Sequence, residues 1–205
     1  MSAPGQEPLV LGVAGSPRRG GNSDRLLSAA LTGAREAGAR TEMFVAAGSG
    51  IDPCLGCNAC ARDGMCIQRD AGPALYATLD EADAIVIASP VYFATVPGVL
   101  KVLYDRMQPY WARTHVLKQP RPPRRPGGIL LVRAGGDPFG FDAAEATTRS
   151  VLAVLGVDVL GVVRIHGVDE PADLAASFPA EWEAARELGH AVAQDAARRR
   201  AEGRP

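Results

Sequence analysis

Short apolar runs alternate with amphipathic segments along most of the chain, and this alternation constrains the fold more than any other feature. Residues 84–88 read Ala-Ile-Val-Ile-Ala, which is typical of a strand buried on both faces of a parallel sheet. Residues 23–37 place Leu27, Ala30 and Leu31 at helical spacing. Similar patterns predict strands at residues 9–14, 41–46, 84–88, 128–132 and 157–165, and helices at residues 23–37, 72–80, 97–107, 142–155 and 181–200.

Five strands separated by helices predict an α/β fold. We expect the flavodoxin-like layout, a doubly wound five-stranded parallel sheet with helices on both faces and ligands at the carboxyl ends of the strands. Residues 1–205 fit one domain, with a cysteine-rich loop at 50–70 and a C-terminal helix at about 180–200. We also expect Pro90 to end the third strand, and residues 118–128, rich in proline and arginine, to form a connection.

The charge balance gives no reason to expect a polyanionic partner. The formal net charge is -1, so we expect neither nucleic acid nor a membrane surface as partner. No apolar run approaches the ~20 residues that span a bilayer, and residues 1–8 lack the basic start and apolar core of a signal peptide. These features predict a cytoplasmic protein, in which clustered cysteines serve more often as ligands or redox groups than as disulfides.

The first predicted strand leads into a loop that is suited to hold a phosphate. Residues 15–23 read Gly-Ser-Pro-Arg-Arg-Gly-Gly-Asn-Ser and precede a helix, so backbone N–H groups and the helix N-terminus are available to an anion. Ser16 and Ser23 add hydroxyl groups, Arg18 adds a guanidinium group, and Asn22 adds an amide. These four side chains are therefore candidate phosphate ligands.

The same loop matches neither of the two common nucleotide-binding motifs. A Walker A loop ends in Gly-Lys-Ser/Thr, but here Gly20 is followed by Gly21 and Asn22. The dinucleotide motif G-x-G-x-x-G is broken at residues 12–14, which read Gly-Val-Ala. A mononucleotide phosphate is the favoured ligand, and the alternative is a plain tight turn in which Asn22 or Ser23 caps the helix.

Two more loops follow predicted strands at the same edge of the sheet. Residues 89–98 read Ser-Pro-Val-Tyr-Phe-Ala-Thr-Val-Pro-Gly, and prolines on both sides stiffen a backbone that presents Tyr92 and Phe93. Such a loop is suited to support a flat ring system, although the two aromatic rings could instead cover the sheet edge. The loop after the fourth strand contains Gly135 and Gly136, which allow close backbone approach to a ligand.

All four cysteines of the chain lie within one short segment. Cys54, Cys57, Cys60 and Cys66 form the pattern C-x2-C-x2-C-x5-C. Four thiolates at this density suit one iron–sulfur cubane, but the last gap differs from the C-x2-C-x2-C-x3-C-P run of two-cluster ferredoxins. A zinc site, redox-active or reduced thiols, and simple packing of small apolar side chains are the alternatives.

These motifs together resemble the NAD(P)H-dependent FMN reductases of flavodoxin-like fold, and the cysteine segment resembles the iron–sulfur flavoproteins within that group. The resemblance implies FMN as cofactor, NAD(P)H as co-substrate and a [4Fe–4S] cluster on the four cysteines. It implies that the first loop binds the FMN phosphate and that the other two contact the isoalloxazine ring. The implied FMN-binding residues are Ser16, Arg18, Asn22, Ser23, Pro90, Val91, Tyr92, Phe93, Gly135 and Gly136, and the implied metal ligands are Cys54, Cys57, Cys60 and Cys66.

The predicted function is that of an FMN-dependent NAD(P)H oxidoreductase that passes electrons through flavin and the cluster to a small-molecule or protein acceptor. The flavin carries the chemistry, so no catalytic side chain is predicted. By resemblance we expect a homodimer or homotetramer. Two alternatives are a cluster-free reductase of flavin, quinones, or nitro or azo compounds, and a flavin electron carrier without a small-molecule substrate of its own.

Overall fold

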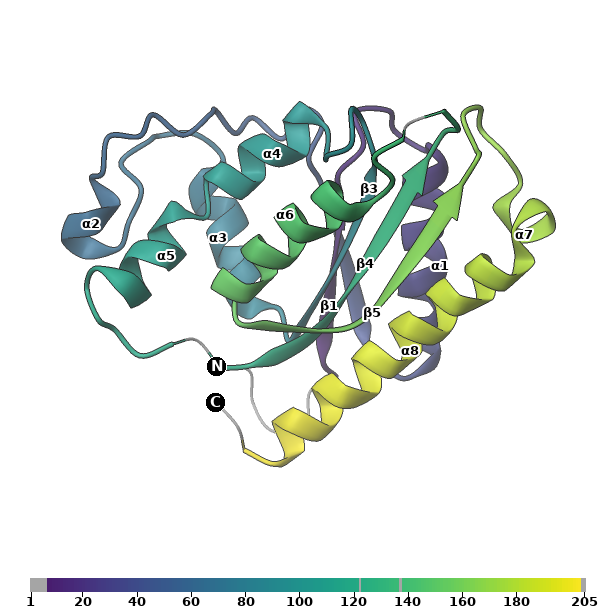
Figure 1. Ribbon diagram of the computed structural model, residues 1–205. Coiled ribbons are helices and arrows are strands. Elements are labelled where there is room, and N and C mark those ends of the chain that lie inside the picture. The colour runs from purple at the N-terminus through teal and green to yellow at the C-terminus, as the bar shows by residue number, and fades with distance from the viewer. Residues whose placement is uncertain (1–6, 122, 137, 204–205) are drawn as a thin grey trace.

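The chain folds around one parallel sheet of five strands, which confirms the predicted fold class. The computed structural model describes residues 7–121, 123–136 and 138–203. The strands lie in the order β2-β1-β3-β4-β5, and each neighbouring pair is parallel (Figure 1). They are β1 (Leu9–Ala14), β2 (Arg40–Val45), β3 (Ala84–Pro90), β4 (Arg125–Arg133) and β5 (Val157–His166). The order reverses between β1 and β3, the switch point at which such sheets bind ligands.

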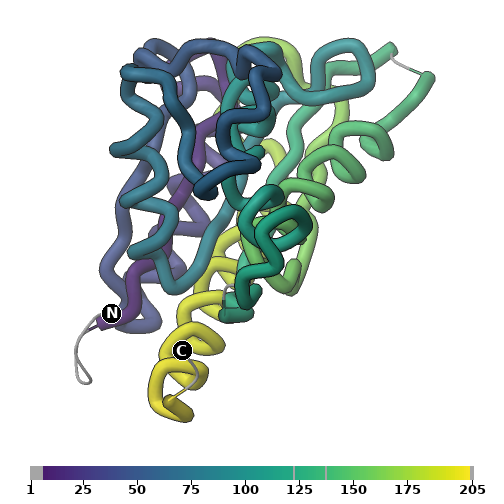
Figure 2. The backbone as a smooth tube through the Cα atoms, turned by 90° about the vertical axis from the view of Figure 1, so that its left-hand side faces the viewer, coloured from purple at the N-terminus to yellow at the C-terminus, as the bar shows by residue number. Residues whose placement is uncertain are grey.

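Helices cover both faces of this sheet. They are α1 (Asn22–Glu36), α2 (Cys60–Asp63), α3 (Gly72–Glu81), α4 (Gly98–Asp105), α5 (Gln108–His115), α6 (Asp142–Val154), α7 (Leu174–Ser177) and α8 (Pro179–Ala201). The α1 and α8 helices pack together on one face, where Leu27 and Val192 are fully buried. On the other face Leu100 of α4 and Leu152 of α6 belong to a second core. Figure 2 shows the cysteine-rich loop (dark blue) in front of this second layer.

The inner strands are more buried than the edge strand β2. The β1 strand and the residues of β3 before Pro90 have no exposed side chain, whereas every residue of β2 is half-buried or exposed. Near-continuous apolar sequence in β1 and β3 follows from this burial on two faces. Within the described residues, no helix combines the length and the apolar character that crossing a membrane requires.

The β3 strand runs two residues further than predicted and includes Pro90, which pairs with Val132 of β4. The strand does end at Pro90, as expected, but the predicted bound at residue 88 was two residues short. Proline can take part in the last pairing because alternate residues of a parallel strand bond to opposite neighbours. The Ala88 carbonyl accepts from the Gly15 amide on the β1 side, and the Val91 amide donates to Val132 on the β4 side. The missing N–H of Pro90 therefore falls on the side where β1 has already ended.

The predicted connection at residues 118–128 is shorter than expected, because β4 begins at Arg125. The Arg125 backbone pairs with Val157 of β5. Its side chain is largely buried and donates to the carbonyl oxygens of Leu79 and Ala82 at the end of α3. These carbonyl groups accept from a terminal nitrogen of the guanidinium and so compensate part of the cost of burying it.

Three short helices were not predicted from the sequence. The predicted helix at residues 97–107 ends at Asp105, and a separate helix, α5, begins at Gln108 with Pro109 in its first turn. The other two, α2 and α7, are single turns of four residues each. Helices this short are stabilised by tertiary contacts rather than by their own sequence pattern, so periodicity does not reveal them.

Candidate functional site

A cavity of about 800 Å³ opens at the carboxyl ends of the strands. Four segments that are distant in sequence line it, and they follow β1, β3, β4 and β5. The predicted FMN-binding residues in its lining are Ser16, Arg18, Asn22, Ser23, Pro90, Val91, Tyr92, Phe93 and Gly135. Gly136 is next to this set but does not line the cavity, and Asp137 of the same loop lies outside the described residues. The fold thus brings together the loops that the sequence marked separately.

The loop after β1 is shaped by backbone contacts. The Gly15 amide donates to the Ala88 carbonyl at 2.8 Å, and a side chain at Gly15 would overlap Leu100 of α4. Glycine is therefore required where the chain leaves the sheet. The Ser16 hydroxyl accepts from the Arg18 amide at 3.0 Å and donates to the Arg18 carbonyl at 2.9 Å, which closes a tight turn. Ser16 and Ser23 are both buried, and Arg18 is exposed.

The helix that follows begins without a side-chain cap. Gly21 occupies the N-cap position of α1, so neither Asn22 nor Ser23 caps the helix, in contrast to the alternative considered from the sequence. The N–H groups of the first turn have no intrahelical acceptor, and the helix dipole adds positive potential at this end. This geometry suits a bound phosphate.

The Asn22 side chain joins the first loop to the segment after β5. Its amide nitrogen donates to the Glu170 carbonyl at 2.8 Å, and its oxygen accepts from the Ala172 amide at 3.0 Å. The Arg25 guanidinium donates to the Ala172 carbonyl at 2.8 Å. Both amide atoms are thereby engaged, so Asn22 holds the 168–171 wall of the cavity in place. A direct contact of this amide with phosphate stays a prediction.

A carboxylate that the sequence analysis overlooked lies against the same loop. Asp24, in the first turn of α1, accepts a hydrogen bond from the Gly20 amide at 2.9 Å. Burial raises the pKa of this carboxyl. An acidic residue in the first turn of a helix is the signal that could have identified it, because the helix dipole favours negative charge there.

The aromatic loop after β3 is a tight turn in a strained conformation. Tyr92 and Thr95 exchange two backbone hydrogen bonds, of 2.8 Å and 3.1 Å. Between them Phe93 and Ala94 have φ of 49° and 65°, a left-handed region that non-glycine residues rarely adopt. The Phe93 side chain is 100% exposed at the rim of the cavity. Strain of this kind concentrates at ligand sites, where the surrounding structure holds it in place.

Several lining residues of the cavity were not identified from the sequence. The last residue of β4, Arg133, contributes a guanidinium 5.2 Å from the centre of the Phe141 ring, and the loop that follows β4 contributes Phe139, which is largely exposed. The segment after β5 contributes Val168 and Asp169. These residues have no motif of their own. They could have been found only from the rule that the carboxyl ends of parallel strands meet at one edge.

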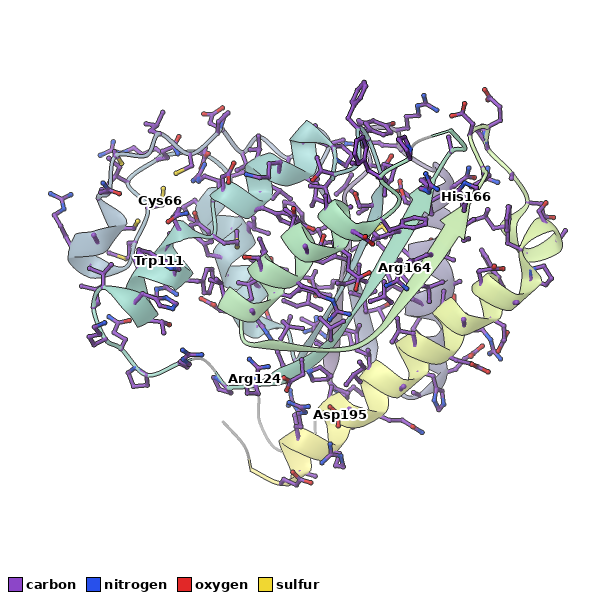
Figure 3. The ribbon with its side chains drawn as sticks, viewed as in Figure 1. Cys66, Trp111, Arg124, Arg164, His166 and Asp195 are labelled. Carbon is purple, nitrogen blue, oxygen red and sulfur yellow. The ribbon has the colours of Figure 1, made fainter. Side chains whose placement is uncertain are left out.

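A second cavity, of about 340 Å³, lies in the cysteine-rich loop, and all four cysteines line it. Cys57 is exposed and the other three are partly buried, and none forms a disulfide. Burial raises the pKa of the Cys60 thiol. Figure 3 labels Cys66 near Trp111 of α5, on the side of the molecule away from β5.

The donor set of this cavity is chemically suited to an iron–sulfur cluster. All four cysteines line it, and a [4Fe–4S] cubane takes four cysteine thiolates, one on each of its irons. A zinc ion can also take four thiolates, each about 2 Å from the metal. Among the described residues, no three His, Cys, Asp or Glu side chains form a group that could hold a metal ion. The four thiols match a cubane in kind and number, and the cluster itself stays a prediction.

A buried ion pair lies directly beneath the cysteine loop. The Arg106 side chain is 1% exposed and that of Asp70 is 6% exposed. Both terminal nitrogens of Arg106 donate to the Asp70 carboxylate. In addition, Nη1 donates to the Asp52 carbonyl at 2.8 Å, and Nη2 donates to Cys66 Sγ at 3.5 Å. The guanidinium group holds the pKa of the Asp70 carboxyl well below its usual range. A second cation, Arg113, donates to the Gly64 carbonyl at 2.9 Å.

The fold is a doubly wound parallel sheet, as in flavodoxin-like proteins, and the first cavity is lined by a glycine-rich loop and an aromatic turn at the carboxyl ends of its strands. The family model for NADPH-dependent FMN reductases matches residues 8–166. An iron–sulfur flavoprotein from Archaeoglobus fulgidus is 37% identical over 160 residues, which are 78% of this chain and 69% of that protein. One from Methanocaldococcus jannaschii is 41% identical over 100 residues, 49% of this chain and 52% of that protein.

Solved structures agree on the fold. An NAD(P)H:quinone oxidoreductase from Methanothermobacter marburgensis superposes with a TM-score of 0.63 at 19% identity, covering 90% of this chain and 98% of that one. The chain belongs to the NADPH-dependent FMN reductase family. Membership confirms the predicted resemblance, FMN as the cofactor and NAD(P)H as the co-substrate of a flavin oxidoreductase.

Proposed function

We propose that this protein is an oxidoreductase of the iron–sulfur flavoprotein type, which takes electrons from NAD(P)H and passes them through FMN and a [4Fe–4S] cluster. The observation that carries the proposal is the presence of two separate cavities in one chain. One is lined by the phosphate loop and the aromatic turn, and the other by all four cysteines. The iron–sulfur flavoproteins among the relatives support the same assignment.

The first cavity provides the groups that FMN requires. Ser16, Arg18 and Ser23, with the N-terminus of α1, lie where the phosphate would bind, and Asn22 holds the wall beside them. The phosphate dianion of FMN would be attracted by the exposed guanidinium of Arg18 and by the positive end of the helix dipole. A flat ring would lie against the segment formed by Pro90, Val91, Tyr92 and Phe93, with Gly135 across the cavity.

Each group has a distinct chemical task. Bound FMN supplies the hydride-accepting ring, and the protein supplies binding, orientation and electrostatics. No side chain is assigned to proton transfer. Cys54, Cys57, Cys60 and Cys66 are proposed to hold the cluster, which would exchange single electrons with a small-molecule or protein acceptor. We further propose that the protein works in the cytoplasm as a homodimer or homotetramer.

Anaerobic purification followed by measurement of iron, sulfide and flavin tests this proposal. The expected result is one FMN and four iron atoms per chain, with the two flavin absorption bands above a broad brown shoulder. Protein that stays colourless after incubation with FMN would contradict the whole assignment. Protein that binds flavin but takes up no iron during reconstitution with ferrous iron and sulfide would contradict the cluster and leave the FMN assignment intact.

A second candidate is a cluster-free NAD(P)H-dependent quinone reductase. The observation in its favour is the pair of exposed aromatic side chains at the cavity rim, Phe93 and Phe139, which offer stacking surface to a flat acceptor. Steady turnover of NADPH with a quinone by iron-free protein would support it. Turnover that requires the cluster would favour the first proposal.

A further inference from the structure

The buried pair of Arg106 and Asp70 lies at the wall of the cysteine cavity. Arg106 lines that cavity, and its Nη2 donates to Cys66 Sγ at 3.5 Å. The guanidinium therefore holds a fixed positive charge and an N–H donor beside any group that the four cysteines bind.

We propose that Arg106 is a positioning residue that raises the reduction potential of the cluster, and that Asp70 sets the size of this effect. The inference rests on the proposed cluster. One-electron reduction of a bound cluster, with no proton taken up, would increase the negative charge beside Arg106 by one unit. A fixed cation and an N–H···S hydrogen bond stabilise that more negative state, and both raise the potential of an iron–sulfur centre.

Asp70 opposes this effect and also makes it possible. Its carboxylate accepts from both terminal nitrogens of Arg106, which orients the guanidinium group toward Cys66. Its negative charge also cancels part of the positive potential at the sulfur. The Asp52 carbonyl holds the same guanidinium from the loop side. Charge and orientation can therefore be separated by replacing the two members of the pair one at a time.

Two single substitutions are expected to shift the potential in opposite directions. Arg106→Gln removes the cation and leaves a buried carboxylate, so the one-electron potential of the cluster falls. Asp70→Asn keeps the cation and removes its counter-charge, so the potential rises. The double variant carries neither charge, so its potential should lie between those of the two single variants. A general loosening of the loop would move both single variants the same way, so opposite shifts report electrostatics rather than damage.

The measurement is an anaerobic redox titration with dithionite, followed by electron paramagnetic resonance, on purified full-length protein. Arg124→Gln is the matched control, because it removes one positive charge from an exposed pair with Asp158, and its potential should equal that of the wild type. If Arg106→Gln does not retain iron, Asp70→Asn decides alone: a rise supports the proposal, and a fall or no change overturns it.

The possible failures are distinguishable. Wild-type protein that takes up no iron after reconstitution would overturn the cluster and this proposal with it. A wild-type cluster whose potential is the same in both single variants, or moves the same way in both, would overturn the role of Arg106 and leave the proposed function intact.

Discussion

The two cavities of this protein are built in different ways. The larger one, which we propose as the flavin cavity, is assembled from segments at the ends of four strands, so the packing of the whole sheet and its helices positions its walls. The cysteine cavity is formed mainly by one continuous segment and by the junction of α4 and α5. That segment is tied to the domain by side-chain contacts, chiefly from Arg106 and Arg113. We infer that the two cavities can be disrupted independently.

The strongest test of this independence is Cys57→Ser. The hydroxyl group of serine is a poor ligand for iron, so we expect complete loss of iron while FMN stays at one per chain. Iron and flavin analysis measures both in one preparation. Arg62→Gln, an exposed change in the same loop, should retain both groups. Iron that survives Cys57→Ser would refute the assignment of this cysteine.

Asp70→Ala should loosen the cysteine loop without opening the flavin cavity. Removing one member of a buried ion pair leaves a charge uncompensated and costs about 3–5 kcal/mol. Hydrogen exchange is expected to increase in peptides covering residues 50–70 and to be unchanged in peptides covering residues 15–23. Glu81→Ala breaks an exposed pair with Arg40, outside the lining of either cavity, and should cost less than ~1 kcal/mol. Equal exchange in both regions would show that the two cavities are coupled.

Acid should weaken the ion pair between Asp70 and Arg106. The pKa of the Asp70 carboxyl is lowered in the folded protein by Arg106, so the stability it contributes is present above the ordinary pKa of 3.8 and is lost as pH falls below it. The test compares the iron-free variant Cys57→Ser with the double variant Cys57→Ser, Asp70→Asn by urea unfolding at pH 7 and pH 3. The free energy of unfolding should fall more between the two pH values in the protein that keeps Asp70. Equal losses in the two proteins would contradict this assignment.

Asn22→Ala should weaken FMN binding and leave the cysteine cavity unchanged. It removes two hydrogen bonds to the segment after β5, each worth about 1 kcal/mol, so FMN affinity should fall by up to about thirtyfold. Isothermal titration of the flavin-free protein measures this change. Thr32→Ala, further along α1 and away from the cavity, serves as the control. Unchanged affinity for FMN would mean that this wall does not contribute to binding.

The smallest expected effect is at Ala94. Its φ of 65° is a conformation that costs a non-glycine residue roughly 1 kcal/mol, so Ala94→Gly should raise the free energy of unfolding by up to about that amount. Urea denaturation measures the change. A decrease would show that the turn is held by contacts of the Ala94 methyl group rather than merely tolerating strain.

Much of the fold was predictable because local sequence and burial agree. The continuous apolar run of β3 could only be a strand buried on both faces, and α1 shows its apolar face at helical spacing. Predictions failed where tertiary contacts overrode local rules. Pro90 is accommodated because its missing donor faces no neighbour, and Arg125 is buried because carbonyl oxygens of α3 surround it.

By itself, the sequence determined the alternation of strands and helices, the phosphate loop and the cysteine spacing, because each depends on residues that are close along the chain. Tertiary structure alone decided which distant groups meet. It placed Asn22 against Ala172, and Arg106 between Asp70 and Cys66. Such pairs leave no local pattern, since contacts between segments far apart in sequence depend on how the whole sheet and its helices pack.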